Sequence, residues 1–470
     1  MDFAAKYKTS DYDDYDKFMI PNPEGQSFRF TNMRYIALTL GCCLILGCYY
    51  CYDNPSALES QLTDQKGTFK LSLVKYNLLY SVYSFPNIIL PLFGGLLIDK
   101  LGIRVGIVLF SILLIIGQFF VMLGGIMASF GILIMGRIVF GFGAESLSVT
   151  QSTLIAKWFT YKELAFALGL KIAVSRLGST ANSALTPLLY NVYNGYFLPL
   201  FVGLILCCFS CVSGLFFCWM DKESCRREGR IKGGANEPDE SDKIKFSDFK
   251  NFNLTYWLLA INSMLTYGAF YSFTGNSNDL LNKMFRVPND TAGLYIMIIY
   301  FIAACVTPFF GKIFDKYGKR ALMLILSLCL FVLAILFLIF FPEDIGGPAT
   351  LFPLICTGIF YSIYAAIFWP CIALVVEKRT LGTAYGLVTS MQNLNLTVSP
   401  VLFGAIHDTT TNNRGGYFWS GAFVMFQALI ALYFAVAIDM LDYKNGNVLN
   451  KVNSMNKSLF LKASNQAIQK

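Results

Sequence analysis

Twelve apolar segments, each long enough to cross a lipid bilayer, constrain this sequence more than any other feature. A transmembrane helix needs about 20 consecutive, mostly apolar residues. Six such segments precede a charged stretch in the middle of the chain, and six follow it. They run at residues 33–54, 74–98, 105–128, 132–156, 163–188 and 197–220, and then at 254–276, 291–314, 320–341, 350–376, 382–406 and 417–438. We therefore predict an all-α membrane protein in which twelve transmembrane helices form two six-helix bundles.

The composition supports a membrane protein and argues against a nucleic-acid-binding one. Hydrophobic residues make up 55% of the chain and charged residues only 14%, whereas soluble domains carry about 25% charged residues. The net charge is +8, but the basic residues lie in short runs between apolar segments, which is typical of cytoplasmic loops. Because Lys and Arg are concentrated on the side of both termini, we predict that both termini are cytoplasmic.

Polar stretches divide the chain into five regions. Residues 1–32 are rich in Asp, Tyr and Lys and are predicted to be a disordered cytoplasmic tail. The charged stretch at 221–253 contains Gly and Pro and is interpreted as a cytoplasmic linker. The two bundles then occupy residues 33–220 and 254–440, and residues 441–470 form a second cytoplasmic tail.

The same short motif stands between the second and third apolar segments and between the eighth and ninth. Both copies read G-x-x-x-D-K-x-G and are followed by basic residues, and a repeat at half the chain length is typical of a duplicated six-helix unit. The glycine allows two helices to approach closely, and the aspartate can cap an opposing helix and pair with Arg or Lys. We predict a gating latch, the alternative being an ordinary basic turn with a capping aspartate. Its residues are Gly95, Asp99 and Arg104 in the first copy and Gly311, Asp315 and Arg320 in the second.

This repeated loop resembles the loop motif of the major facilitator superfamily. The segment RIVFGFG, which begins at Arg137, also resembles the helix-four motif of that superfamily. The resemblance extends over residues 33–440. It implies two pseudo-symmetric six-helix bundles that rock around a central cavity.

Two charged residues, Glu145 and Arg176, lie near the centres of the fourth and fifth apolar segments. At 1.5 Å per residue, each lies about 20 Å from the end of its helix, and so near the midplane of a hydrocarbon core about 30 Å thick. A charge at this depth costs at least a few kcal/mol, so such residues usually face each other, water or a ligand. Polar residues recur at helical spacing with each charge, which gives both helices a polar stripe.

Two hypotheses account for these charges. In the first, Glu145 receives a substrate ammonium group and Arg176 a substrate carboxylate, since the planar guanidinium can bond both carboxylate oxygens. In the second, the two residues form a structural ion pair that locks the helices, with Arg137 or Lys171 taking part. The hypotheses are compatible if the pair closes in the empty cavity and opens for a zwitterion. We expect the two side chains to come close enough to pair.

Aromatic and amide side chains are further candidates for lining the cavity. Tyr49 and Tyr52 lie one turn apart in the first segment, and Trp369 precedes a proline in the tenth. Asn393 lies in the eleventh segment. Each has an alternative interpretation as a helix-packing hydrogen bond or an interfacial aromatic residue.

Several longer blocks resemble the lysosomal dipeptide transporter group, the branch called major facilitator superfamily domain-containing protein one. The blocks are CYYCYDNPSAL, YSFPNIILPLFGGLLIDKLGIR, RIVFGFGAESLSVTQST, SRLGST, IFWP and LGTAYGLVTSMQNL, from both halves of the chain. The resemblance implies facilitated uniport of dipeptides, particularly those with basic residues, out of lysosomes. It also implies that Glu145 and Arg176 contact the dipeptide. The matching blocks further contain Tyr49, Tyr52, Trp369 and Asn393.

The same resemblance implies a partner and a compartment. Animal members depend on a glycosylated single-span accessory protein that shields them from lysosomal proteases. The sequon Asn289-Asp-Thr291 is a plausible lumenal glycosylation site in this chain. Animal members also carry an N-terminal acidic dileucine sorting signal, whereas this tail instead contains Tyr15-Asp-Lys-Phe18, which fits a tyrosine-type pattern. We expect a lysosomal or vacuolar membrane, with the plasma membrane as the alternative.

Other functions on the same fold remain as alternatives. A proton-coupled peptide carrier typically has two glutamates and an arginine together on its first helix, a trio that the first segment lacks. A carrier of amino acids, organic anions or sugars is a second option, although a neutral sugar needs no opposed acid and base. A nutrient sensor would keep the cavity charges and transport no substrate.

An enzyme is least supported, because we find no convincing nucleophile triad, metal cluster or phosphate loop. The single histidine, His407, cannot make a multi-histidine metal site. No cofactor is predicted.

Overall fold

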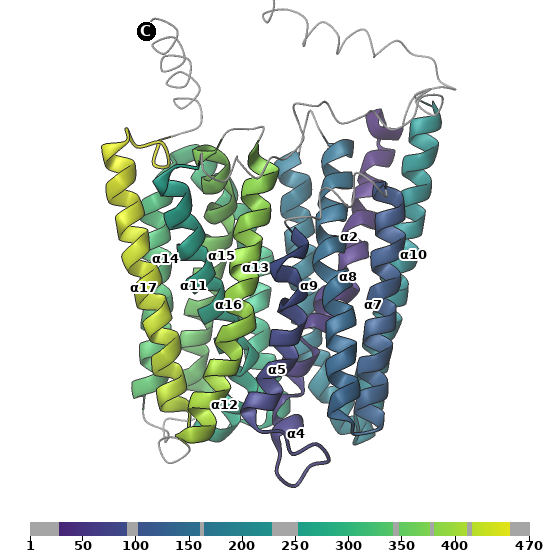
Figure 1. Ribbon diagram of the computed structural model, residues 1–470, viewed down its shortest axis with the longest axis vertical. Helices are drawn as coiled ribbons and strands as arrows, with labels where there is room; N and C mark the ends of the chain where they lie inside the picture. Colours follow the sequence, from purple (N-terminus) through teal and green to yellow (C-terminus); the bar gives the residue numbers. More distant parts are fainter. Residues whose placement is uncertain are drawn as a thin grey trace, which may run out of the picture.

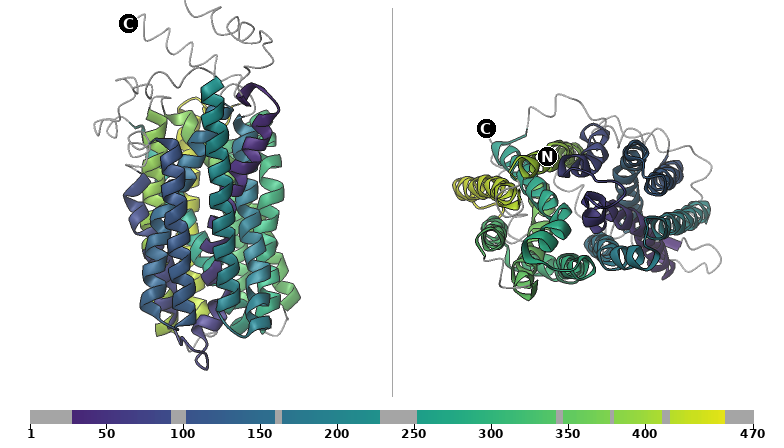
Figure 2. Two further views of the ribbon diagram at one scale, coloured as in Figure 1. Left: turned by 90° about the vertical axis from the view of Figure 1, so that its right-hand side faces the viewer. Right: turned by 90° about the horizontal axis from the view of Figure 1, so that it is seen from below.

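Two bundles of long helices stand side by side in the computed structural model, which describes residues 28–91, 102–159, 164–227, 252–341, 347–376, 380–410 and 416–451. Helices α2 to α10 form one bundle and α11 to α17 the other (Figure 1). A view along the helices shows the same two groups (Figure 2). The all-α fold class with two six-helix bundles is therefore confirmed.

Most helix bounds follow the predicted segments within several residues, but α5 ends at Ser84 although its segment was predicted to run to residue 98, and residues 92–101 lie outside the described part. The first bundle contains α2 (Met33–Tyr52), α5 (Leu73–Ser84), α7 (Ile103–Ile126), α8 (Phe130–Trp158), α9 (Leu164–Tyr193) and α10 (Phe197–Arg227). The second contains α11 (Leu254–Gly275), α13 (Asn289–Tyr317), α14 (Arg320–Phe340), α15 (Leu351–Val375), α16 (Leu381–Thr409) and α17 (Tyr417–Lys444). Short helices lie between them, namely α3 (Asn54–Ala57), α4 (Glu59–Thr63) and α12 (Ser277–Phe285), with 3-10 turns η1 (Phe28–Phe30), η2 (Pro86–Ile88) and η7 (Gly347–Thr350).

The start of α2 and the ends of α10 and α17 lie on one side of the molecule, here called the terminal side (Figure 1). Helices α4 and α12 lie on the other side, here called the opposite side. Helix α10 continues to Arg227 and α17 to Lys444, beyond the predicted bundle ends at 220 and 440. Leu449 is fully buried, so packing in the second bundle includes residues that were predicted to belong to the tail.

Eight of the described helices are long and apolar enough to span a bilayer. Helices α5, α9, α11 and α16 are more polar or shorter. Three of them lie where the bundles meet, since α5 packs against α16 and α9 packs against α13. A helix face that packs against another helix is shielded from lipid, so it can carry polar side chains. The polar helices are thus placed around the centre of the molecule.

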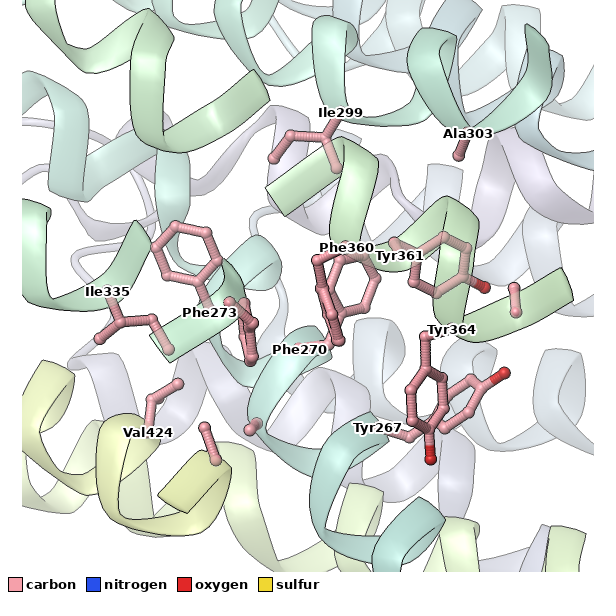
Figure 3. Packing of buried hydrophobic residues seen from close by; sticks show 14 of the residues in the cluster. Tyr267, Phe270, Phe273, Ile299, Ala303, Ile335, Phe360, Tyr361, Tyr364 and Val424 are labelled. Atoms are coloured by element: carbon pink, nitrogen blue, oxygen red, sulfur yellow. The ribbon is translucent and has the colours of Figure 1, made fainter. Parts of the chain in front are cut away.

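Stacked aromatic rings fill the middle of the second bundle (Figure 3). The rings of Phe331 and Phe360 stack with centroids 4.4 Å apart, and those of Phe270 and Tyr361 stack at 4.5 Å. Such offset pairs contribute about 0.5–1.5 kcal/mol beyond their buried area. Because Tyr361 belongs to this packed core, its hydroxyl group is held in a defined position.

Hydrogen bonds join the two bundles on the opposite side. The Ser60 hydroxyl lies 3.2 Å from the Asn278 side-chain oxygen, and Asn77 and Asn276 exchange amide hydrogen bonds of 2.8 and 2.9 Å. The carboxylate of Asp408, near the end of α16, accepts from the backbone N–H groups of residues 73 and 74 at 3.2 Å each. Asp408 thereby caps the N-terminus of α5, where the helix dipole favours a negative charge. These contacts hold the two bundles together on the opposite side, and they are called the seal below.

Close helix approach within the first bundle depends on small residues. A Cβ atom at Gly117 of α7 would lie 2.5 Å from the backbone nitrogen of Phe140 in α8. A Cβ atom at Gly136 of α8 would lie 2.6 Å from the backbone nitrogen of Val121. Each contact involves backbone on the neighbouring helix, which cannot rotate away. The two glycines therefore set the distance between α7 and α8.

We predict that Gly117→Ala lowers the thermal unfolding midpoint of the detergent-purified protein, because overpacking of this kind costs about 1–3 kcal/mol. The matched control is Gly131→Ala in α8, where an added Cβ would meet open space. Alanine there stabilises a helix by about 0.5–1 kcal/mol relative to glycine. A Gly117→Ala midpoint equal to or above that of the wild type would contradict the prediction.

Candidate functional site

Arg137, the first residue of the helix-four motif, is buried inside the first bundle and binds backbone carbonyls. It donates to the carbonyl oxygens of Leu79, Cys51 and Tyr52 at 3.2–3.3 Å, and only 2% of its surface is exposed. These bonds tie α8 to the C-terminal end of α2 and to the middle of α5. Arg137 therefore has a structural role.

Arg176 lies on α9 of the first bundle and is held by tyrosines of the second. Its guanidinium group donates to the hydroxyl of Tyr271 at 3.4 Å and to the hydroxyl of Tyr361. The guanidinium carbon also lies 4.6 Å from the ring centroid of Tyr361 and 5.4 Å from that of Tyr49. A cation in this position is stabilised by cation–π attraction and neutral acceptors. The buried Asp53 carboxylate lies within electrostatic range, but no salt bridge among the described residues involves Arg176. A ligand carboxylate could therefore take one face of the guanidinium.

Glu145 lies on α8 and is partly exposed. Within the described part of the chain its carboxylate makes no ion pair and no hydrogen bond. It lies within electrostatic range of Lys171, whose ammonium group binds the Ser148 hydroxyl at 3.0 Å and the Ser152 hydroxyl at 2.5 Å. Since Ser148 is one turn beyond Glu145 on α8, the ammonium group of Lys171 is held one turn away from the carboxylate. Glu145 is thus an open acceptor for a hydrogen-bonding cation.

The expectation that Glu145 and Arg176 pair is wrong for this conformation. No ion pair joins them among the described residues, and Arg176 instead contacts Tyr271 and Tyr361. The physical reason is that tyrosine hydroxyls and rings from the other bundle supply enough favourable interaction to hold the guanidinium. The structural ion-pair hypothesis therefore does not describe this state.

The other predicted cavity residues fall into two groups. Tyr49 contacts Arg176, and Tyr52 packs edge-on against Tyr271 with ring centroids 5.8 Å apart, so both adjoin the arginine. Trp369 packs against Tyr385 in its own bundle, and Asn393 donates to the carbonyl of Thr389 within α16. The Asn393 side-chain oxygen is buried without a hydrogen-bond partner, and no contact places it or Trp369 beside Arg176 in the described structure.

The predicted latch is only partly described. Gly95 and Asp99 lie outside the described residues, and the side chain of Asp315 in α13 does as well. Arg104 binds the Asp221 carboxylate of α10 at 2.7 Å, so it acts within the first bundle. At Gly311 an added Cβ would meet open space, so the close helix approach expected there is absent from this conformation.

The last latch residue, Arg320, is buried and contacts the segment that follows α17. Its guanidinium group donates to the carbonyl of Lys451 at 3.5 Å. The backbone of the same turn is bound by Asn450, whose carbonyl accepts from Lys319 at 2.9 Å and whose side chain accepts from Ala321 at 3.1 Å. The second copy of the motif thus anchors the segment after α17.

Tyr271 and Tyr361 are the site residues that the sequence analysis missed. The pairs Tyr267–Tyr271 and Tyr361–Tyr364 stand at helical spacing in the seventh and tenth segments, and this spacing was the available signal. Figure 3 shows Tyr361, Tyr364 and Tyr267 at one edge of the aromatic core, with the hydroxyl of Tyr361 at its border. The first bundle supplies the charge, and the second bundle supplies its acceptors.

Comparisons with known proteins place the chain in a family and match its fold. A family profile described as Major Facilitator Superfamily matches residues 55–400 and 259–454. The lysosomal dipeptide transporter MFSD1 of Bos taurus is 35% identical over 427 residues, covering 89% of this chain and 87% of the relative. The Homo sapiens protein of the same name is 33% identical over 427 residues, covering 89% and 88%. A crystal structure of a mutant of the nucleoside transporter NupG superposes with a TM-score of 0.68 at 14% identity, covering 86% of this chain and 99% of that one.

We predict that Arg137→Lys lowers the thermal unfolding midpoint, because a lysine ammonium group cannot reproduce the three-carbonyl fork. A lost hydrogen bond to a charged group costs about 1.5–3 kcal/mol. The control is Arg226→Lys, whose side chain is 71% exposed in a surface pair with Glu223 and whose change should cost no more than about 0.5 kcal/mol. Equal midpoints for the two variants would argue against a structural role for Arg137.

Proposed function

This chain belongs to the major facilitator superfamily and, within it, to the lysosomal dipeptide transporter group, and from this membership we propose that it carries dipeptides across a lysosomal or vacuolar membrane. Relatives at 35% and 33% identity over nearly the whole chain bear that name. The family match and the fold support the more general conclusion that the chain is a multi-pass membrane transporter of small molecules. The dipeptide, the mode of transport and the compartment are the parts that we propose.

The observation that carries the proposal is a pair of separate charges at the centre of the fold, which form no salt bridge with each other or with another side chain of the described residues. Glu145 is an open acceptor, and Arg176 is held by neutral tyrosines. A dipeptide has a cationic and an anionic end, so it can satisfy Glu145 with its ammonium group and Arg176 with its carboxylate. A neutral sugar would offer neither charge an ionic partner.

We propose alternating access as the mechanism, with the terminal side facing the cytoplasm. The seal on the opposite side then separates the centre from the lumen, and the bonds of Arg176 to Tyr271 and Tyr361 join the bundles at the level of the binding site. A substrate carboxylate on Arg176 would compete for these tyrosine contacts. Binding would therefore change the free energy of the interface that must rearrange during transport.

Family resemblance is also the basis on which we propose a partner. The proposed partner is a glycosylated single-span accessory protein on the lumenal side. The sequon residue Asn289 begins α13 on the opposite side, which is the lumenal side in the proposed orientation. Its side-chain oxygen is buried without a hydrogen-bond partner.

We predict that Glu145→Gln and Arg176→Ala each reduce dipeptide uptake by reconstituted proteoliposomes by about tenfold or more, because each loses a charge-assisted hydrogen bond of about 1.5–3 kcal/mol. The matched controls are Glu223→Gln and Arg226→Ala, which change a surface pair at the end of α10 and should transport normally. Folding is checked by size-exclusion chromatography and thermal unfolding. Normal uptake by folded Glu145→Gln and Arg176→Ala would disprove the site.

Uniport is distinguished from proton coupling by the final substrate concentration. We predict that internal dipeptide rises to the external concentration and no further, with or without a pH gradient across the proteoliposome. Glu145 could carry a proton if burial favoured its neutral form, and accumulation driven by pH would then follow. Accumulation above the external concentration would establish the proton-coupled alternative, and binding without flux would indicate a sensor.

A further inference from the structure

Two carboxylates from different bundles meet inside the seal on the opposite side. Glu59 lies on α4 of the first bundle and Asp279 on α12 of the second, and they are 0% and 2% exposed. One Glu59 carboxylate oxygen, Oε2, accepts from the backbone N–H of Asp279 at 2.9 Å. Helices α4 and α12 pack directly against each other. Any separation of the bundles on this side must therefore separate these two residues.

The two carboxylates differ in their hydrogen-bond and ionic partners. The Asp279 carboxylate binds the Lys283 ammonium group at 2.7 Å and accepts from the hydroxyl of Tyr417. Among the residues that the structure describes, no salt bridge involves Glu59, and its second oxygen, Oε1, is buried without any hydrogen-bond partner. A buried carboxylate with an unsatisfied oxygen costs several kcal/mol, whereas the neutral acid costs much less.

The surroundings of Glu59 contain more acceptors and weak acids than cations. Lys283 of α12 is the nearby cation, and it is already paired with Asp279. Tyr76 and Tyr80 of α5 lie within electrostatic range, as does Tyr417 of α17. Asp408 and His407 are further described charged groups on this side, at the end of α16, where Asp408 caps α5 and lies 3.2 Å from a His407 ring nitrogen. Burial, together with the neighbouring Asp279, raises the pKa of Glu59 well above its ordinary value of 4.5.

We propose that Glu59 is a proton-binding site of the seal, and that a proton bound there holds the opposite side closed. The neutral acid fits the buried position beside Asp279, whereas the ionised acid is repelled and left unsatisfied. When the bundles separate on this side, Glu59 meets water and releases its proton. The inference rests on the two-bundle motion proposed above and not on the identity of the cargo.

The direction of the pH effect follows from linkage. The pKa of Glu59 is raised in the sealed state and near its ordinary value in the open, hydrated state. Below the ordinary pKa both states are protonated, and the seal keeps its full stability. As the pH rises through the raised pKa the seal loses stability, and each unit of difference changes the ratio of sealed to open molecules by about tenfold. An acidic medium on the opposite side therefore favours the sealed state.

This role differs from proton-coupled transport. The proton enters and leaves on the same side, so it performs no work on the cargo. It changes how fast molecules interconvert and which state they occupy, and it leaves the final substrate ratio unchanged. A uniporter can therefore depend strongly on pH without accumulating its substrate.

The test measures hydrogen–deuterium exchange in α4 and α12 of the purified full chain in lipid nanodiscs without substrate, corrected for the intrinsic pH dependence of exchange. In the wild type, protection of these helices should fall between about pH 5 and about pH 8 as the seal opens. Glu59→Gln mimics the neutral acid, so its protection should be high and independent of pH. Asp64→Asn, an exposed acid on the same side, is the matched control and should behave like the wild type.

A second variant covers the case in which Glu59→Gln does not fold. Asp279→Asn removes the like charge beside Glu59, which lowers the pKa of the glutamate in the sealed state, so the pH-dependent loss of protection should be smaller and complete at a lower pH. Wild-type protection that does not change with pH, or a Glu59→Gln profile with the wild-type pH dependence, would overturn the proposal. Because exchange needs no cargo, a failure of dipeptide transport would leave this result interpretable.

Discussion

The burial of a guanidinium group at the junction of two bundles is the constraint on which the centre of this protein depends. Arg176 would be very costly there if it had no partners. Tyr271 and Tyr361 supply acceptors and ring faces from the facing bundle, and Phe270 holds Tyr361 by stacking. The aromatic core of one bundle thereby stabilises the charge of the other. The position of the charge in the first bundle therefore depends on the aromatic packing of the second bundle.

Acidic side chains act at two different levels of the structure. Glu145 lies at the central level with its carboxylate open, where it can meet a ligand. Glu59 and Asp279 lie at the seal, where one is paired and the other is not. Asp408 lies at the same level as the seal and is satisfied by a helix N-terminus. The partners of each acid, more than its burial alone, distinguish the proposed ligand-binding and proton-binding roles from the capping of a helix.

Local sequence patterns were enough to predict the helices, because a bilayer-length apolar run has few other solutions. The depths of Glu145 and Arg176 also follow from helix rise alone. Their partners do not, because Tyr271 and Tyr361 are separated from Arg176 by 95 and 185 residues, and hydrophobic periodicity contains no information about such pairs. Arg137 was singled out as a motif residue, but its three carbonyl partners, at the end of α2 and in the middle of α5, depend on how these helices pack against α8. Glu59 and Asp279 lie outside the predicted spans and were missed for that reason.

The bond between Arg320 and the carbonyl of Lys451 has a consequence for the order in which the molecule is assembled. The two residues are 131 positions apart, so at about 5–20 residues per second the ribosome supplies the partner roughly 7–26 seconds after the arginine. During that interval the turn between α13 and α14 is already synthesised, but the segment after α17 that contacts the guanidinium group of Arg320 is not. The second bundle can therefore reach its final packing only late in biosynthesis, when α17 and the residues beyond it have arrived.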